Sequence, residues 1–375
     1  MQVYLFDIMP WPYRQSEIPH PFPGYMYDRS LGKELYDGHL ALYRRADELG
    51  YDGVCFAEHH YGTNSVDPSP NLMAAAVATQ TSNCKIVIMG NCLPMHGHPV
   101  RLAEELAMLD VLSNGRLVSG FIRGGAGEYW AYNVDIARGR SMFNEAADLI
   151  VKAWTEDEPF EWHGEHYHYD TVSILPRPLQ RPHPPVVMAG NSAESIEWAA
   201  ERRYPLYTSF SPTDQIAETF SYYRKYAEEE CGWTPPPDYM GVSRQCYVAP
   251  TDEQAREEIE EHAMTFYSVL AAPAKQAEMA SLNARRNTPR SFDYKSSGHV
   301  HLNQAGGADW DRVQDLGLLI TGSPDTVIRK IREQKEALGV GTFLTYLPFG
   351  SLEPKQAMGS LDLFAKEVLP VIRDD

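Results

Sequence analysis

The sequence predicts an α/β protein built as a single (β/α)8 TIM barrel with insertions, spanning residues 1–375. Three observations support this fold class. Short apolar runs alternate with longer segments of helical periodicity, which is the pattern that builds a parallel sheet. The alternation supplies eight strands and reaches the end of the chain without a change in composition that would mark a second domain. Polar side chains follow several of these strands, at the end of a barrel where catalytic groups are usually held.

The first half of the chain begins with an alternating strand over residues 2–8. A segment rich in proline and aromatic residues follows over residues 9–27, and it is longer than an ordinary connector. Apolar residues at helical spacing predict a helix over residues 32–49 that ends at Gly50. The same reasoning gives strands over residues 51–57, 85–93 and 116–122, helices over 71–82, 100–112 and 142–154, and a hairpin over 160–169.

The second half of the chain continues the alternation. Ser323 and Pro324 suit the N-cap and the first position of a helix that ends near Gly339. The predicted strands cover residues 185–189, 206–210, 240–249 and 341–347, and the predicted helices cover residues 193–202, 214–230, 251–270, 323–339 and 354–372.

Residues 275–317 interrupt this pattern because they lack a clean period. We expect them to form a mobile insertion between strands seven and eight, whose ends border the mouth of the barrel. Such a segment is a candidate lid that closes when a cofactor binds. Closure would bring Arg285, Arg286 and Arg290 near an anionic cofactor, and the alternative is that these arginines form a solvated face.

Composition indicates a globular protein of a reducing cytoplasm. Hydrophobic residues make up 43% of the chain and aromatic residues 11%, enough for a sizeable packed core. The balance of 33 basic against 51 acidic residues gives a net charge of -18, which disfavours nucleic acid and anionic membrane surfaces as partners. The five cysteines are scattered without a C-x-x-C pair, so neither a disulfide framework nor a zinc site is predicted. No signal peptide or membrane span is predicted.

The strand predicted over residues 51–57 runs directly into Glu58, His59 and His60. Three titratable side chains at the carboxyl end of a barrel strand predict a catalytic site. A histidine of the core would more often lie in the middle of a strand among apolar neighbours. The alternative interpretation is that the two histidines are hydrogen-bonded for structural reasons.

A second group of polar residues predicts an anion site. Ser192 and Ser195 begin the helix over residues 193–202, where free backbone N–H groups and the helix dipole favour a phosphate. The alternative for Ser192 is an N-cap role alone. Arg123 follows the fourth strand and is placed to add a bidentate contact to the same phosphate. Other strand ends contribute Asn91, Gly190, Asn191 and Ser209.

Three histidines of the predicted hairpin, His163, His166 and His168, raise the question of a metal site. Alternation in a hairpin puts His163 out of phase with the other two, whereas metal ligands must converge. We therefore expect a surface hairpin and no metal.

Six short stretches spread over the chain form one recognisable set. They are YDGVCFAEHH at residues 51–60, LPMHGHPVRLAEE at 93–105, LDVLSNGRL at 109–117, GFIRG at 120–124, SIEWAA at 195–200 and GSPDTV at 322–327. With these stretches the chain resembles the bacterial luciferase-like, flavin-dependent monooxygenase family, from residue 2 to the C-terminus. The set is specific for the family and does not specify a substrate.

The resemblance implies a TIM barrel that binds FMN, uses it as reduced flavin supplied by a separate reductase, and lets it react with O2. It also implies two catalytic residues. Glu58 matches the acidic residue beside the flavin, and His59 matches the active-site histidine, with His60 as a structural partner. Ile122 stands where the luciferase itself has a reactive cysteine, a departure that argues against light emission.

The resemblance further assigns the cofactor-binding residues. Arg123, Ser192 and Ser195 match contacts to the flavin phosphate. Gly90 and Asn91 fall where the family often has a non-proline cis peptide under the flavin ring, a bond that persists only where the surrounding structure enforces it. The same cofactor site is expected to include Gly190, Asn191 and Ser209.

The expected function is a two-component FMN-dependent monooxygenase acting on a small, fairly apolar organic molecule, by hydroxylation or Baeyer–Villiger-type oxygen insertion. The alternative is a deazaflavin-dependent hydride-transfer oxidoreductase on the same fold. A third possibility is a non-catalytic flavin-binding or storage protein. We expect the chain to act as a homo-oligomer such as a dimer.

Overall fold

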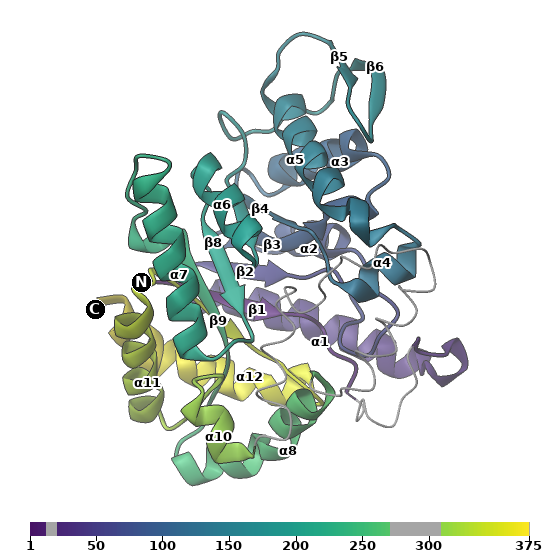
Figure 1. Ribbon diagram of the computed structural model, residues 1–375. Helices are drawn as coiled ribbons and strands as arrows, with labels where there is room; N and C mark the ends of the chain where they lie inside the picture. The colour runs from purple at the N-terminus through teal and green to yellow at the C-terminus, as the bar shows by residue number, and fades with distance from the viewer. Residues whose placement is uncertain (13–20, 271–308, 375) are drawn as a thin grey trace.

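The computed structural model describes residues 1–12, 21–270 and 309–374. Within these residues, eight parallel strands close into a ring with the helices outside it (Figure 1). The predicted (β/α)8 barrel is therefore confirmed. The barrel strands are β1 (Gln2–Asp7), β2 (Gly53–Phe56), β3 (Lys85–Cys92), β4 (Leu117–Ile122), β7 (Val186–Ala189), β8 (Leu206–Ser209), β9 (Met240–Val248) and β11 (Thr342–Tyr346).

The ring closes where the first strand meets the last. Strand β1 pairs in parallel with β2 on one side and with β11 on the other, with Gln2 opposite Thr342 and Phe6 opposite Tyr346. On the far side, β8 pairs with β9, and β9 pairs with β11. Because every pairing in the ring is parallel, all the strand carboxyl ends face one mouth.

A ninth strand, β10 (Leu319–Gly322), pairs with the second half of β9 and was not predicted from the sequence. Its four residues are too few to show a periodic pattern beside the predicted helix start at Ser323. The predicted insertion over residues 275–317 lies mostly outside the described residues, as do Arg285, Arg286 and Arg290. Its described end is not irregular, because Trp310–Asp315 form helix α10.

The outer helices follow the predicted order. They are α1 (Arg29–Glu48), α2 (Pro70–Ala78), α3 (Pro99–Leu112), α5 (Gly139–Thr155), α6 (Ala193–Arg202), α7 (Thr213–Glu229), α8 (Asp252–Leu270), α11 (Pro324–Leu338), α12 (Pro354–Leu363) and α13 (Leu369–Asp374). Helix α1 begins at a true cap, since the Asp28 side chain accepts from the N–H groups of Ser30 and Leu31. None of the described helices is long and apolar enough to cross a membrane.

The predicted hairpin forms from β5 (Phe160–His163) and β6 (His168–Val172), and it projects from the barrel at the top of Figure 1. Its register pairs His163 directly with His168, so the expected phase difference between them was wrong. Side chains alternate between the two faces only within one strand. The residues of the turn break this alternation, so counting from His163 to His168 does not give their relative faces. His166 instead contacts helix α5, where its Nε2 lies 2.7 Å from the Ser141 hydroxyl.

Candidate active site

Glu58 is the centre of a buried hydrogen-bond cluster where β2 and β3 end. Its Oε1 lies 3.1 Å from Nε2 of His60, and its Oε2 lies 3.2 Å from Nε2 of His96. The backbone N–H of Cys92 also donates to Oε2 at 3.1 Å. The parallel pairing of β2 with β3 brings these residues together from distant parts of the sequence.

This cluster keeps Glu58 ionised. Burial alone would raise the pKa of its carboxyl group, but the hydrogen bonds from His60, His96 and the Cys92 amide outweigh burial and lower the pKa to about 2. An ionised carboxylate only accepts hydrogen bonds, so the Nε2 atoms of His60 and His96 carry protons. The Nδ1 of His60 then accepts from the Tyr132 hydroxyl, 3.4 Å away. Glu58 and Tyr132 therefore hold His60 in a fixed orientation.

His59 turns away from this cluster to a different carboxylate. Its Nδ1 lies 3.1 Å from Oε1 of Glu128, and the His59 side chain remains 32% exposed. The accepting carboxylate places the proton on Nδ1 and leaves the lone pair on Nε2. Of the two histidines, His59 is thus the one that combines a fixed tautomer with access to the mouth.

Glu128 lies on helix α4 (Ala126–Tyr132), an element that was missed in the sequence. The glycines at positions 124, 125 and 127 and the length of seven residues hid it. The Glu128 Oε2 accepts from the N–H of Gly125 at 3.0 Å and so caps the helix that carries it. The capping pattern of an acid three residues after the N-cap was the one signal available in the sequence.

Arg140 and two serines meet at the start of helix α6, and Arg123 lies near the same turn, paired with Glu194. Ser192 is the N-cap, and its hydroxyl lies 2.9 Å from that of Ser195. The Nη2 of Arg140 lies 3.2 Å from the Ser195 hydroxyl and 3.4 Å from the Ser192 hydroxyl. The structure thus brings Ser192 and Ser195 together as predicted, and Arg123 shares the carboxylate of Glu194 with Arg140.

Arg140 was missed because no sequence signal separates it from other basic residues near a helix start. It is the second residue of α5, and only the packing of α5 beside α6 brings it to the serines. Burial lowers the pKa of Arg140, and the positive charge of Arg123 lowers it further, while Glu194 opposes both effects. The site therefore concentrates positive charge in a partly buried place.

These residues fit a phosphate group. The first turn of a helix offers unpaired N–H groups and a positive dipole end, and two guanidinium groups can supply bidentate contacts. The Nη1 of Arg140 is buried and has no hydrogen-bond partner among the described residues, which suits an anion that completes the site. Gly190 packs close to Ser195, since a Cβ at position 190 would lie 3.2 Å from the Ser195 Cβ.

Helix α4 joins the phosphate-type site to the histidine site. Glu128 contacts His59, and the hydroxyl of the next residue, Tyr129, donates to the backbone carbonyl of Arg123 at 2.9 Å. Tyr129 is buried. Helix α4 therefore contacts both groups of polar residues, which lie near the ends of β2, β3, β4 and β7.

The expected cis peptide at Gly90 and Asn91 is not found, because the cis bonds among the described residues all precede prolines. The pairing of β3 with β4 instead contains a bulge between Ile88 and Asn91. Gly90 is required there, since a Cβ would lie 2.4 Å from the carbonyl oxygen of Gly120. The Asn91 amide donates to Asn71 of helix α2 at 3.1 Å, so its nitrogen is engaged with the helix layer.

Two other residues predicted for the cofactor site, Ser209 and Asn191, are not hydrogen-bonded to this group in the described part of the chain. Ser209 ends β8 opposite Ser243 of β9, and no hydrogen bond among the described residues joins it to Arg123 or Arg140. Asn191 directly precedes Ser192 in the sequence, and no hydrogen bond in the described part of the chain joins its side chain to Arg123, Arg140 or the two serines. The cofactor roles of both residues stay predictions.

Aromatic side chains and unpaired polar groups lie on the other side of the mouth. The ring of Tyr346 contacts Phe6, Phe210 and Phe266 at centroid distances of 5.5, 5.7 and 5.6 Å. Gln245 is the register partner of Tyr346 on β9. The Tyr346 hydroxyl and both polar atoms of Gln245 are buried without a partner among the described residues, which is unusual for a folded core.

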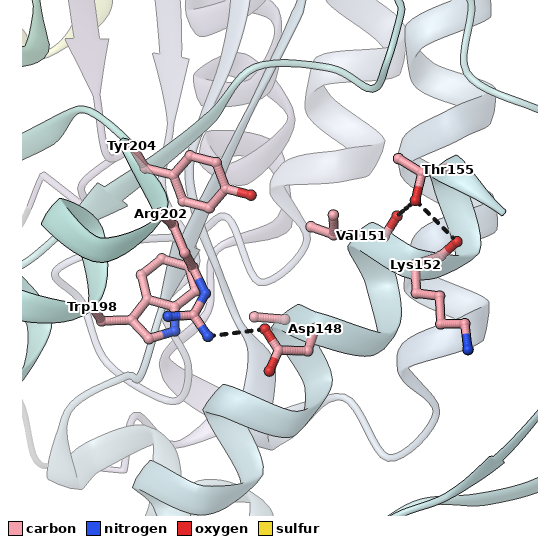
Figure 2. Close-up of a pocket in the computed structure, with 8 residues that line it drawn as sticks. Asp148, Val151, Lys152, Thr155, Trp198, Arg202 and Tyr204 are labelled. Carbon is pink, nitrogen blue, oxygen red and sulfur yellow. Dashed lines mark hydrogen bonds and ion pairs between the residues drawn. The ribbon is translucent and has the colours of Figure 1, made fainter. Parts of the chain in front are cut away.

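A separate surface cavity of about 370 Å³ lies between α5 and α6 (Figure 2). In Figure 2 the guanidinium group of Arg202 lies over Trp198, and a dashed line joins it to Asp148. The two side chains are 3.1 Å apart, so Arg202 already has an anionic partner. The cavity is further along both helices than Arg140 and Ser192 and contains none of the site residues. No group of residues suited to hold a metal ion is found in the described part of the chain.

Comparison with known proteins connects this site to a family. The sequence matches the model of the luciferase-like monooxygenases over residues 20–342. The oxygenase component of the flavin-dependent trigonelline monooxygenase of Acinetobacter baylyi is 26% identical over 352 residues, which cover 92% of this chain and 92% of that protein.

Two solved structures show how widely the fold is used. The oxygenating constituent of 3,6-diketocamphane monooxygenase from Pseudomonas putida, a type II Baeyer–Villiger monooxygenase in complex with FMN, superposes with a TM-score of 0.77 at 24% identity and covers 99% of this chain and 98% of its own. A secondary alcohol dehydrogenase that depends on coenzyme F420 superposes with a TM-score of 0.67 at 16% identity, covering 100% and 99%. At these identities the likeness concerns the fold alone.

Proposed function

Because this chain belongs to the luciferase-like monooxygenase family, we propose that it is an FMN-dependent monooxygenase that oxygenates a small, fairly apolar organic molecule. The observation that carries the proposal is the phosphate-type cradle of Arg123, Arg140, Ser192 and Ser195, joined through helix α4 to His59. These four residues would hold the phosphate of the flavin, and helix α4 contacts both Arg123 and His59.

Each part of the site has a task in this reaction. Reduced FMN, when bound, supplies the electrons that activate dioxygen. Arg123 and Arg140 neutralise the phosphate and fix its position. His59 holds its proton on Nδ1 against Glu128, so its Nε2 can accept a proton at the mouth and return it in a later step. Glu58 supplies a permanent negative charge that orients His60 and His96.

The aromatic cluster around Tyr346 supports the substrate class. Rings from β1, α8 and the residue after β8 pack together near the mouth, so the barrel wall on this side is apolar, which favours an apolar molecule and excludes water. The reaction is hydroxylation or Baeyer–Villiger-type insertion. We expect a separate reductase to supply the reduced flavin, since the trigonelline relative is itself named an oxygenase component.

The proposal is tested with the purified chain. Anaerobic titration with reduced FMN should show saturable binding, and admission of O2 should give an absorbance change that differs from that of free reduced FMN. A panel of aldehydes, ketones and terpenoids should then give a product that incorporates one oxygen atom from O2. Tight binding of a deazaflavin with oxygen-independent hydride transfer would replace the proposal, and FMN binding without any oxygen-dependent chemistry would indicate a flavin-storage role.

A further inference from the structure

The carboxylate of Glu194 pairs with both arginines of the phosphate cradle. Its Oε2 lies 3.0 Å from Nη2 of Arg140, accepts a hydrogen bond from Nε of the same residue at 3.1 Å, and lies 3.9 Å from Nη1 of Arg123. Glu194 belongs to the first turn of α6, the same turn that begins with Ser192. A side-chain anion thus contacts the guanidinium groups that a flavin phosphate would contact.

We propose that Glu194 is an internal competitor for this anion site, which lowers the affinity for FMN and promotes its release. The inference rests on the proposed function and adds to it a residue that sets flavin affinity. Nη1 of Arg140 is free to bind a phosphate, but a phosphate that also takes the Nε and Nη2 edge for a bidentate contact has to displace the carboxylate of Glu194. The free energy of that displacement is subtracted from the free energy of binding.

Exposure makes the displacement feasible. The Glu194 side chain is 63% exposed, whereas those of Arg123 and Arg140 are only 23% and 22% exposed. The carboxylate can rotate into water, where it is well solvated, while the guanidinium groups remain in place. Even after it has turned away, Glu194 stays in the first turn of α6 beside the arginines and would repel a phosphate bound there.

The charges explain why a competitor is useful. Among the described residues, Glu194 is the one carboxylate paired with either Arg123 or Arg140. Without it, an empty site would hold two guanidinium groups close together and partly buried, and the lowered pKa of Arg140 reflects burial and the charge of Arg123. As the flavin leaves, Glu194 returns and compensates these charges. A cofactor that must be exchanged in every cycle gains from such a device.

The opposite role for Glu194 makes the opposite prediction. If the carboxylate served to position the arginines for the phosphate, its removal would let them repel each other and would weaken FMN binding. The direction of the change in affinity therefore separates competition from positioning.

The test compares Glu194→Gln with Glu197→Gln, which makes the same change in net charge on the same helix. Glu197 accepts a hydrogen bond from Tyr222 of α7, and among the described residues no hydrogen bond or ion pair joins it to the cradle. Dissociation constants are measured for oxidised FMN, riboflavin and inorganic phosphate. In Glu194→Gln we expect FMN and phosphate to bind roughly three- to tenfold more tightly, as for the loss of one nearby like charge at a solvated site. Riboflavin, which lacks the phosphate, should bind with unchanged affinity.

Stopped-flow dilution should also show slower FMN dissociation from Glu194→Gln than from the wild type. Unchanged or weaker FMN binding in Glu194→Gln would overturn the proposal, as would equal tightening in Glu197→Gln or equal tightening for riboflavin. A wild-type protein that binds no FMN would defeat the proposed function instead. In that case the phosphate titration still decides the role of Glu194, and absence of any tightening for phosphate would overturn it too.

Discussion

Glu128 accepts a hydrogen bond from His59 with one carboxylate oxygen and caps helix α4 with the other. The distances are 3.1 Å to Nδ1 of His59 and 3.0 Å to the N–H of Gly125. A residue held at both oxygens cannot rotate without breaking one of these bonds. The orientation and tautomer of His59 are therefore set by the same residue that fixes the start of the helix.

The first prediction concerns this pair. Glu128→Gln keeps the side-chain size and still caps Gly125, but its amide N–H₂ then faces His59 and favours the tautomer with the proton on Nε2. We expect turnover to fall about 10- to 100-fold, the scale of a misdirected general base, with little change in the KM for FMN. His59→Asn should lower turnover by roughly 10² or more.

The double variant provides the control for this prediction. If Glu128 acts through His59, Glu128→Gln adds little to the loss already present in His59→Asn, because the two residues work as one unit. Independent, multiplicative losses would show that Glu128 supports activity only by stabilising α4. Normal turnover in His59→Asn would make His59 structural.

The second prediction concerns the arginines. Arg140→Ala and Arg123→Ala should each weaken FMN binding by roughly one to two orders of magnitude, as expected for loss of about 1.5 to 3 kcal/mol from a charge-assisted contact. Riboflavin affinity should change little. Arg202→Ala is a control, because Arg202 ends helix α6, far along the helix from Ser192 and Ser195, and pairs with Asp148 away from the cradle. An Arg140→Ala protein with wild-type FMN affinity would remove this residue from the phosphate site.

The third prediction concerns pH and Asp67. This carboxyl group is 3% exposed, and burial raises its pKa from the ordinary 3.8 to about 7, aided by the charges of Asp7 and Glu58. Between these two values the folded protein binds a proton that the unfolded chain has lost, so Asp67 makes stability fall as the pH rises from about 4 to about 7. Above pH 7 the contribution stays constant.

Asp67→Asn removes this penalty and keeps an oxygen for the Ser69 N–H, which donates to Asp67 at 3.1 Å in the wild type. Urea unfolding at pH 8 should show the variant to be more stable, by an amount on the order of 2 to 4 kcal/mol, since each pKa unit corresponds to about 1.4 kcal/mol. The difference should shrink toward zero at pH 4. A difference that does not depend on pH would mean that Asp67 is ionised in the folded protein throughout this range.

The fourth prediction concerns Gly90. An added methyl group would lie 2.4 Å from the carbonyl oxygen of Gly120 on the neighbouring strand, so Gly90→Ala must push β3 and β4 apart at the bulge. We expect a loss of roughly 1 to 3 kcal/mol in the free energy of unfolding. Gly97→Ala is the matched control, because a Cβ there meets nothing within 4 Å. Equal stability of the two variants would show that the bulge adapts without cost.

The barrel was predictable because its strands are buried on both faces. Continuous apolar runs such as residues 85–93 stand out between amphipathic helices, and the observed β3 covers Lys85–Cys92. Glu58 and His59 could be selected as candidates for a related reason, since the sequence indicates where the buried strand before them ends. The same holds for Ser192, which begins a well-formed helix.

The missed residues depend on tertiary packing. Arg140 reaches Ser195 across 55 positions of sequence, and Glu128 reaches His59 across 69. Neither segment contains a local sequence pattern that indicates which residue it contacts. The predicted phase of the hairpin histidines was wrong for a similar reason, because the turn between His163 and His168 decides which residues face each other.

The pairing of β1 with β11 means that the barrel cannot close until residues 2–6 meet residues 342–346. During synthesis, β1 emerges first and must wait for residues 342–346 before its second edge is covered. Until then the growing sheet carries two unpaired edges that can join another nascent chain. Truncation after Leu338 would make this state permanent, so premature termination even late in translation should yield aggregates and no partly active enzyme.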